Sequence, residues 1–218
     1  MSELGQMEAL AIIYRCIRKE DLVLGNMNMS TWCMQPIVRK DFPLGSQPNN
    51  LLFGIDMGFC TATACGLALA LPHRKVISID GDGAILMKLA VLADVAQANP
   101  SNLVIVVLDN ESYGGRPKEP TCTATVADLA AIARGSGIRN VKSVNTAVDL
   151  EREFERSLEE KELTFIWAKV QLKAEEISMA FDERYWVDVE WKNAFIRNIE
   201  KTEGIQLITK TVIEHYKP

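Results

Sequence analysis

Two glycines flank an acidic residue at a point where a short strand is expected to give way to a helix. Gly81 and Gly83 permit a sharp turn and a close approach of the backbone to a ligand. The N–H groups of Gly83 and Ala84 would begin the helix and favour a phosphate there. The Asp82 carboxylate would repel that phosphate unless a cation lay between them. The turn is therefore typical of a site for a phosphate and a hard divalent ion such as Mg²⁺.

More oxygen ligands follow the next predicted strand. The uninterrupted apolar run 103–108 is typical of a central strand covered on both faces. After it, Asn110 can supply an amide oxygen and Ser112 a backbone carbonyl oxygen. Because ligands of parallel sheets sit at the carboxyl ends of the strands, we expect Asp82 and Asn110 to lie close together. Either turn alone would be a common loop. The turns at Asp82 and Asn110 follow consecutive strands joined by one crossover helix, and this arrangement favours a shared metal site.

The elements that must position these residues alternate along the chain. Residues 7–17 carry apolar side chains at helical spacing, and the pattern then alternates between strand and helix as far as residue 170. Helices are expected at 7–17, 58–71, 84–98, 126–133 and 147–158, and strands at 22–24, 76–79, 103–108, 140–144 and 164–170. Thr146 or Asn145 can cap the last of these helices. This order predicts an α/β fold with a doubly wound, mostly parallel sheet and helices on both faces.

Composition limits the class of protein. The chain has 218 residues, of which 48% are apolar and 24% charged, with a net charge of −5. These values are ordinary for a globular domain and exclude a largely disordered chain. The acidic balance argues against nucleic acid as the main partner. The weakly charged stretch 51–72 contains too many polar residues for a membrane span, and Glu3 and Glu8 do not fit a secretory signal, so we expect a soluble, cytoplasmic protein.

Other catalytic classes find little support. The five cysteines form no CxxC pair, so the spacing of a zinc ribbon is absent and the cysteine sets of an iron–sulfur cluster are missing. Only two histidines are present, His73 in a predicted exposed turn and His215 near the end of the chain. A Ser-His-Asp hydrolase would need a better-placed base.

The last part of the sequence has a different character. We expect residues 1–174 to form the α/β domain and residues 175–218 to form a helical extension. This extension lacks the alternation but is rich in aromatic residues, unlike a disordered tail. Trp191, Phe195 and Ile199 fit an amphipathic helix, which would pack either on the domain or on another chain.

Together these motifs resemble the signature of thiamine diphosphate enzymes, in which 26 residues separate a Gly-Asp-Gly turn from an asparagine, as they separate Gly83 from Asn110. Residues 1–172 more closely resemble the diphosphate-binding (PP) half of sulfopyruvate and phosphonopyruvate decarboxylases. The resemblance rests on Met7-Glu8-Ala9-Leu10, Met57-Gly58, the run from Gly81 to Met87, and Val106-Val107-Leu108-Asp109-Asn110.

The resemblance implies a role for individual residues. Asp82, the Asn110 amide and the Ser112 carbonyl would hold Mg²⁺. The implied cofactor-binding residues also include Gly81, Gly83, Ala84 and Tyr113, with Asn28 and Ser30 of an earlier loop. Two residues would act on the thiamine itself: Met57 would prop it in its bent form, and the Ile55 carbonyl would accept the 4′-amino group. Core packing is the alternative for Met57.

The resemblance also implies a partner. In the family, a Glu from a separate pyrimidine-binding domain activates the cofactor, and we expect an α-type subunit to supply that domain in a homo- or hetero-oligomer. The expected function is the diphosphate- and Mg²⁺-binding subunit of a 2-oxoacid decarboxylase-like lyase. Two alternatives stay open: the PP subunit of a 2-oxoacid oxidoreductase or acetolactate synthase-like carboligase, and a non-catalytic Mg²⁺-phosphate or nucleotide-binding module. The loop 113–120 departs from the decarboxylase pattern after its glycine pair, which leaves the 2-oxoacid undetermined.

Overall fold

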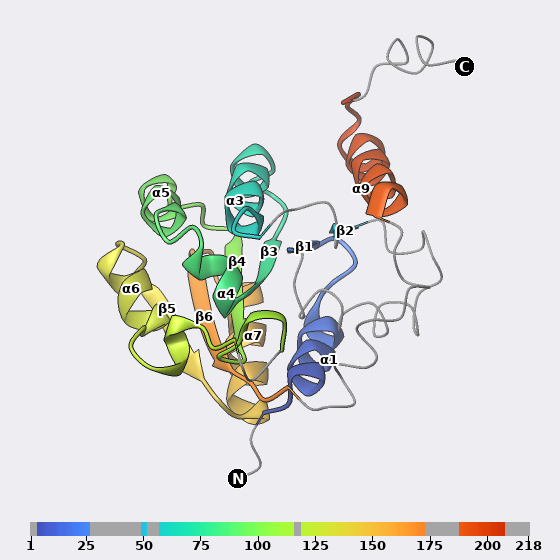
Figure 1. Cartoon of the computed structure of the whole chain (residues 1–218). Helices are drawn as coiled ribbons and strands as arrows, with labels where there is room; N and C mark the ends of the chain where they lie inside the picture. Colours follow the sequence, from blue (N-terminus) through green and yellow to red (C-terminus); the bar gives the residue numbers. More distant parts are fainter. Residues whose placement is uncertain (1–3, 27–48, 52–56, 116–118, 173–187, 208–218) are drawn as a thin grey trace, which may run out of the picture.

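A single parallel sheet organises the molecule (Figure 1). The computed structural model describes residues 4–26, 49–51, 57–115, 119–172 and 188–207. The strands run in the order β2-β1-β3-β4-β6-β5, and every neighbouring pair is parallel. Their bounds are β1 Leu22–Gly25, β2 Asn50–Leu51, β3 Val76–Gly81, β4 Leu103–Asp109, β5 Asn140–Val144 and β6 Thr164–Lys169. The central strands β3 and β4 are buried along their whole length, as the apolar runs predict.

Helices cover both faces of the sheet. Their bounds are α1 Gln6–Cys16, α3 Cys60–Ala70, α4 Asp82–Leu86, α5 Val91–Ala98, α6 Leu129–Gly135, α7 Ala147–Glu159 and α9 Asp188–Glu203. Helices α1 and α7 pack on one face through side chains such as Leu10 and Phe154. Helices α3, α5 and α6 pack on the other through side chains such as Ala64, Leu92 and Leu129. The predicted doubly wound α/β fold is confirmed.

The prediction of one helix over residues 84–98 is wrong, because this segment forms two helices, α4 and α5. Helix α4 begins at Asp82 with Gly81 as its N-cap, so the acidic residue lies in the first turn rather than before it. Residues 87–90 then form turns with i→i+3 hydrogen bonds, such as Met87 N–H to the Ala84 carbonyl at 3.2 Å. No Gly or Pro marks this break, which left the pattern continuous in sequence.

Other boundaries follow their caps. The helix expected from 126 begins at Leu129, because the Asp128 side chain accepts a hydrogen bond from Ala131 N–H and fixes the start there. Of the two candidate caps for α7, Thr146 is the one used, and its hydroxyl accepts from Asp149 N–H at 3.1 Å. The two-residue strand β2 was not predicted, because two residues carry no periodicity.

The C-terminal helix α9 packs on the α/β domain. Phe195 and Ile199 are buried in the core cluster that also holds α3 and α5. At its end, Glu203 pairs with Arg74 at 2.9 Å and with His73 at 2.9 Å. The sequence left open whether this helix packs on its own domain or on another chain. In the structure it packs on its own domain. The boundary proposed at residue 174 lies outside the described residues. None of the helices described is long and apolar enough to cross a membrane.

Candidate cation and diphosphate site

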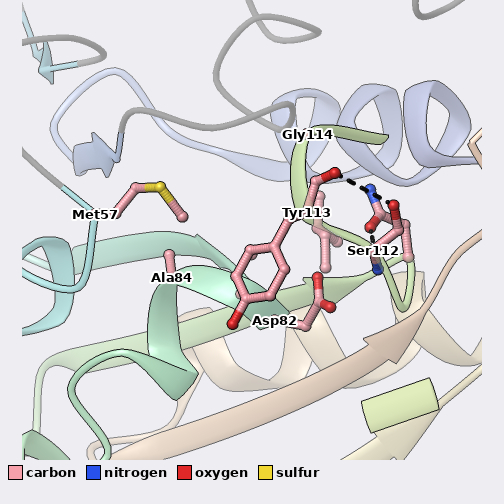
Figure 2. A pocket seen from close by; sticks show the side chains of 10 residues that line it. Met57, Asp82, Ala84, Ser112, Tyr113 and Gly114 are labelled. Atoms are coloured by element: carbon pink, nitrogen blue, oxygen red, sulfur yellow. Dashed lines mark hydrogen bonds between the residues drawn. The ribbon is translucent and has the colours of Figure 1, made fainter. Parts of the chain in front are cut away.

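The ends of two central strands bring the predicted site residues together. Strands β3 and β4 pair in parallel register, with Gly81 opposite Leu108, so Asp82 and Asn110 leave the same edge of the sheet. Both border a small cavity of about 30 Å³ (Figure 2). The residues that line it are Met57, Gly81, Asp82, Gly83, Ala84, Leu108, Asn110, Ser112, Tyr113 and Gly114.

This lining includes every predicted site residue in the described part of the chain. Ile55, Asn28 and Ser30 were also predicted, and they lie outside the described residues. The structure therefore gathers the predicted set in one place. The roles of its members stay predictions.

Gly83 is needed for a close contact with an aromatic ring. A Cβ atom built on Gly83 would lie 2.6 Å from two carbons of the Tyr113 ring, so the ring would have to shift to admit any side chain there. In Figure 2 the Tyr113 ring lies between Ala84 and Asp82. From the sequence we expected this glycine to let a ligand come close to the backbone. In the structure the Tyr113 ring fills the space next to Gly83.

Asp82 is a buried carboxylate whose Oδ2 faces two threonine hydroxyls. Its exposed fraction is 2%. The Thr121 hydroxyl donates to Oδ2 at 2.5 Å and the Thr123 hydroxyl lies 3.4 Å from the same atom. Burial raises the pKa of Asp82 from 3.8 to about 6; the Thr121 hydrogen bond opposes the rise and the nearby Asp109 charge adds to it. Among the described residues, no Lys or Arg forms an ion pair with Asp82.

A tight turn orients the Asn110 amide. Its Nδ2 donates to the buried Gln6 side chain at 3.1 Å, and its Oδ1 accepts from Ser112 N–H at 3.1 Å. Glu111 has a positive φ of 61°, and its N–H donates to Asp109 Oδ1 at 2.9 Å. The turn thus has a fixed shape, which determines where the amide oxygen and the Ser112 carbonyl point.

Asp109 anchors this turn from inside the protein. The side chain is fully buried. Its Oδ1 also accepts from the Thr123 hydroxyl at 2.8 Å, while Oδ2 accepts from Trp167 Nε1 at 2.8 Å and pairs with Lys169 at 2.9 Å. Lys169 also pairs with Glu111 at 2.6 Å. A larger polar cavity of about 300 Å³ lies on this side of Asn110.

Sequence reasoning missed these supporting residues. Thr121 and Thr123 lie beyond the glycine pair, in a loop with no regular pattern, and Gln6 and Trp167 come from distant parts of the chain. One signal was present in the sequence: Trp167 and Lys169 are polar-tipped residues near the end of the predicted strand 164–170.

A second buried carboxylate lies beneath the turn. Asp80 Oδ2 accepts from the Thr61 hydroxyl at 2.6 Å and the Ser78 hydroxyl at 3.1 Å, and Oδ1 accepts from Asn26. Burial raises the pKa of Asp80, and these hydrogen bonds oppose the rise. Asn26 follows β1 and Thr61 lies in the first turn of α3, so Asp80 ties three segments together below the site.

Comparisons with known proteins agree with this geometry. The family model described as "Thiamine pyrophosphate enzyme, C-terminal TPP binding domain" matches residues 33–168. The chain is 36% identical over 118 residues to a sulfopyruvate decarboxylase of Methanosarcina acetivorans, covering 54% of this chain and 30% of that protein. It is 37% identical over 113 residues to sulfopyruvate decarboxylase subunit beta of Methanocaldococcus jannaschii, covering 52% and 59%. The match thus spans less than two thirds of either relative.

The fold has solved counterparts. A structure of a putative thiamin diphosphate-dependent enzyme from Mycobacterium smegmatis superposes with a TM-score of 0.63 at 20% identity, covering 77% of this chain and 32% of that one. At this identity the likeness concerns the fold alone.

Proposed function

Since the chain belongs to the thiamine pyrophosphate enzyme family, through its C-terminal TPP binding domain, we propose that it is the diphosphate- and Mg²⁺-binding subunit of a 2-oxoacid decarboxylase-like lyase. A partner chain with a pyrimidine-binding domain would complete the active site. The observation that carries the proposal is the pairing of the buried Asp82 carboxylate with the Asn110 amide on one cavity at adjacent strand ends.

The residues present fit a divalent cation. Asp82 is a buried acid with no cationic partner among the described residues, and a bound Mg²⁺ would compensate its charge. The donor set consists of a carboxylate, an amide oxygen and the Ser112 backbone carbonyl, which are the hard oxygen ligands that Mg²⁺ prefers. The cavity of about 30 Å³ has room for an ion.

The chain's other residues would bind and orient the cofactor. When bound, thiamine diphosphate supplies the electron sink for the decarboxylation of a 2-oxoacid. Backbone groups of Gly83, Ala84 and Tyr113 would meet its diphosphate. Met57 lines the same cavity, where its thioether side chain would support the thiamine and exclude water. The 2-oxoacid itself would bind where the two subunits meet.

The partner proposal has support in a relative's name. The protein of Methanocaldococcus jannaschii is called subunit beta, which implies at least one other subunit there. We propose the same division here, with the pyrimidine-binding domain on an α-type chain. Decarboxylation would then require both chains, and the PP subunit alone would bind cofactor without turning over substrate.

Calorimetry of the purified chain with thiamine diphosphate and Mg²⁺ tests the cofactor proposal. We expect Mg²⁺-dependent binding that is lost in Asp82→Ala and kept in Asp94→Ala, whose exposed carboxylate lies on α5. Binding of ATP but not thiamine diphosphate would favour a nucleotide-binding module instead. Equal binding by Asp82→Ala and the wild type would reject the site assignment.

The partner proposal needs a separate experiment. Tagged chain purified from its host should carry a protein with a pyrimidine-binding domain, and the reconstituted pair should release CO₂ from a 2-oxoacid. A homo-oligomer of this chain that is active alone would contradict the division of the site.

A further inference from the structure

We propose that Thr121 and Thr123, the threonine pair, are positioning residues that hold the two halves of the cation site in binding geometry. The inference rests on the proposed function, because it assigns the residues that orient its metal ligands. Neither threonine would touch the cation. They would act through Asp82 and through the turn that bears Asn110.

The first half of the evidence concerns Asp82. Both hydroxyl groups approach the same carboxylate oxygen, Oδ2, with the closer contact of 2.5 Å from Thr121. A carboxylate fixed at one oxygen has its second oxygen, Oδ1, in a defined place. The threonine pair therefore restricts the rotamer of Asp82, as does the hydrogen bond from the Gly83 backbone, and the proposal assigns to the cation Oδ1, the oxygen that neither hydroxyl contacts.

The second half concerns the neighbouring strand. The two hydroxyls lie 2.8 Å apart, and Thr123 donates to Asp109 Oδ1 at 2.8 Å. Asp109 directly precedes Asn110. Each hydroxyl carries a single proton, which Thr121 donates to Asp82 and Thr123 donates to Asp109. By these two buried hydrogen bonds the threonine pair connects the end of β3 to the end of β4 and sets the separation between the two side chains that would share the ion.

The backbone around the threonine pair holds the third ligand. Thr121 N–H donates to the Glu111 carbonyl at 3.0 Å, and Tyr113 N–H donates to the Glu119 carbonyl at 2.8 Å. These bonds flank Ser112, whose carbonyl is the remaining proposed ligand. Each of the three ligands is therefore supported by residues 119–123, the return segment of this loop.

Burial separates the threonine pair from other threonines of the loop. Thr121 is 3% exposed and Thr123 7%, whereas Thr125 is exposed. Among the residues that the structure describes, Thr125 also forms no side-chain hydrogen bond with the site. It provides a matched control in the same loop for replacement of a threonine by valine.

The test measures Mn²⁺ affinity by calorimetry in the presence of thiamine diphosphate, using the full chain. Thr121→Val keeps the shape of the side chain and removes its hydroxyl, and we expect about a 10–100-fold loss of affinity, the usual effect of removing a hydrogen bond to a metal ligand. Thr121→Ser restores the hydroxyl and should bind within about threefold of the wild type. Thr125→Val should bind like the wild type.

A second measurement separates positioning from general stability. The free energy of unfolding of each variant is measured in EDTA, and affinities are compared well below the unfolding transition. If Thr121→Val does not fold, Thr121→Ala replaces it, because the smaller side chain puts no methyl group against the carboxylate. Unchanged affinity in a folded variant without the hydroxyl would overturn the inference and leave the proposed function standing. Absence of Mn²⁺ binding in the wild type would overturn both.

Discussion

The buried acid at the start of α4 should cost the cofactor-free protein stability above pH 6. We consider Asp82→Asn, which keeps the shape of the side chain and removes the charge. In the unfolded chain the carboxyl ionises near its ordinary pKa of 3.8, and in the folded protein burial raises that pKa to about 6. The folded state therefore favours the protonated acid. The preference for the protonated acid contributes to the free energy of unfolding at low pH. The wild type loses this contribution as the pH rises from about 4 to about 6, and Asp82→Asn, which has no carboxyl group, does not.

The magnitude follows from the size of the shift. The rise from 3.8 to about 6 corresponds to about 3 kcal/mol in the limit of low pH, at roughly 1.4 kcal/mol per unit. Between pH 8 and pH 5 this shift changes the free energy of unfolding by about 1.4 kcal/mol. Any cost of the amide itself is independent of pH and cancels when the two pH values are compared.

Urea denaturation in EDTA, without thiamine diphosphate, measures this difference. Relative to the wild type, Asp82→Asn should gain about 1.4 kcal/mol on going from pH 5 to pH 8. Asp94→Asn, an exposed carboxylate on α5, controls for the exchange of Asp for Asn. A difference between Asp82→Asn and the wild type that is the same at both pH values would refute the argument that burial raises the pKa of this acid.

Three further substitutions test contacts around the site by urea denaturation. Gly83→Ala should destabilise the protein by about 1–3 kcal/mol because its Cβ would lie 2.6 Å from the Tyr113 ring, and adding Tyr113→Ala should recover part of the loss; an additive pair would speak against this clash. Asp80→Ala should cost at least about 2 kcal/mol because buried hydroxyl donors lose their acceptor, and a neutral outcome would contradict their burial in a dry site. Phe195→Ala should cost about 3–5 kcal/mol, whereas a loss below 1 kcal/mol would mean that α9 contributes little to the core.

Strands with a strong local signal could be predicted from the sequence. The run 103–108 consists of apolar β-formers and becomes β4, which is buried along its whole length. The same run determines where Asn110 falls, since a side chain just after a central parallel strand must lie at the carboxyl edge of the sheet. The meeting of Asp82 and Asn110 at one cavity follows from that topology alone.

Features that depend on tertiary contacts could not be predicted. The separation of α4 from α5 has no Gly or Pro to mark it. The role of Thr121 depends on a loop that returns to β3, and nothing in the local sequence indicates a hydrogen bond to a residue 39 positions earlier. Gln6 likewise reaches the Asn110 amide from a distance of 104 residues in the chain. Periodicity reports which face of an element is apolar, and it carries no information on such long-range polar contacts.

The edges of the sheet bear on how the protein avoids aggregation through its edge strands. An exposed edge strand offers unpaired N–H and C=O groups to another copy of the chain. Here one edge strand, β2, has only two residues and lies against α9. The opposite edge strand, β5, carries Lys142 in its middle, a charge that discourages strand-to-strand pairing. Besides completing the core, α9 thus shields an aggregation-prone margin, and a chain truncated before Asp188 should be less soluble.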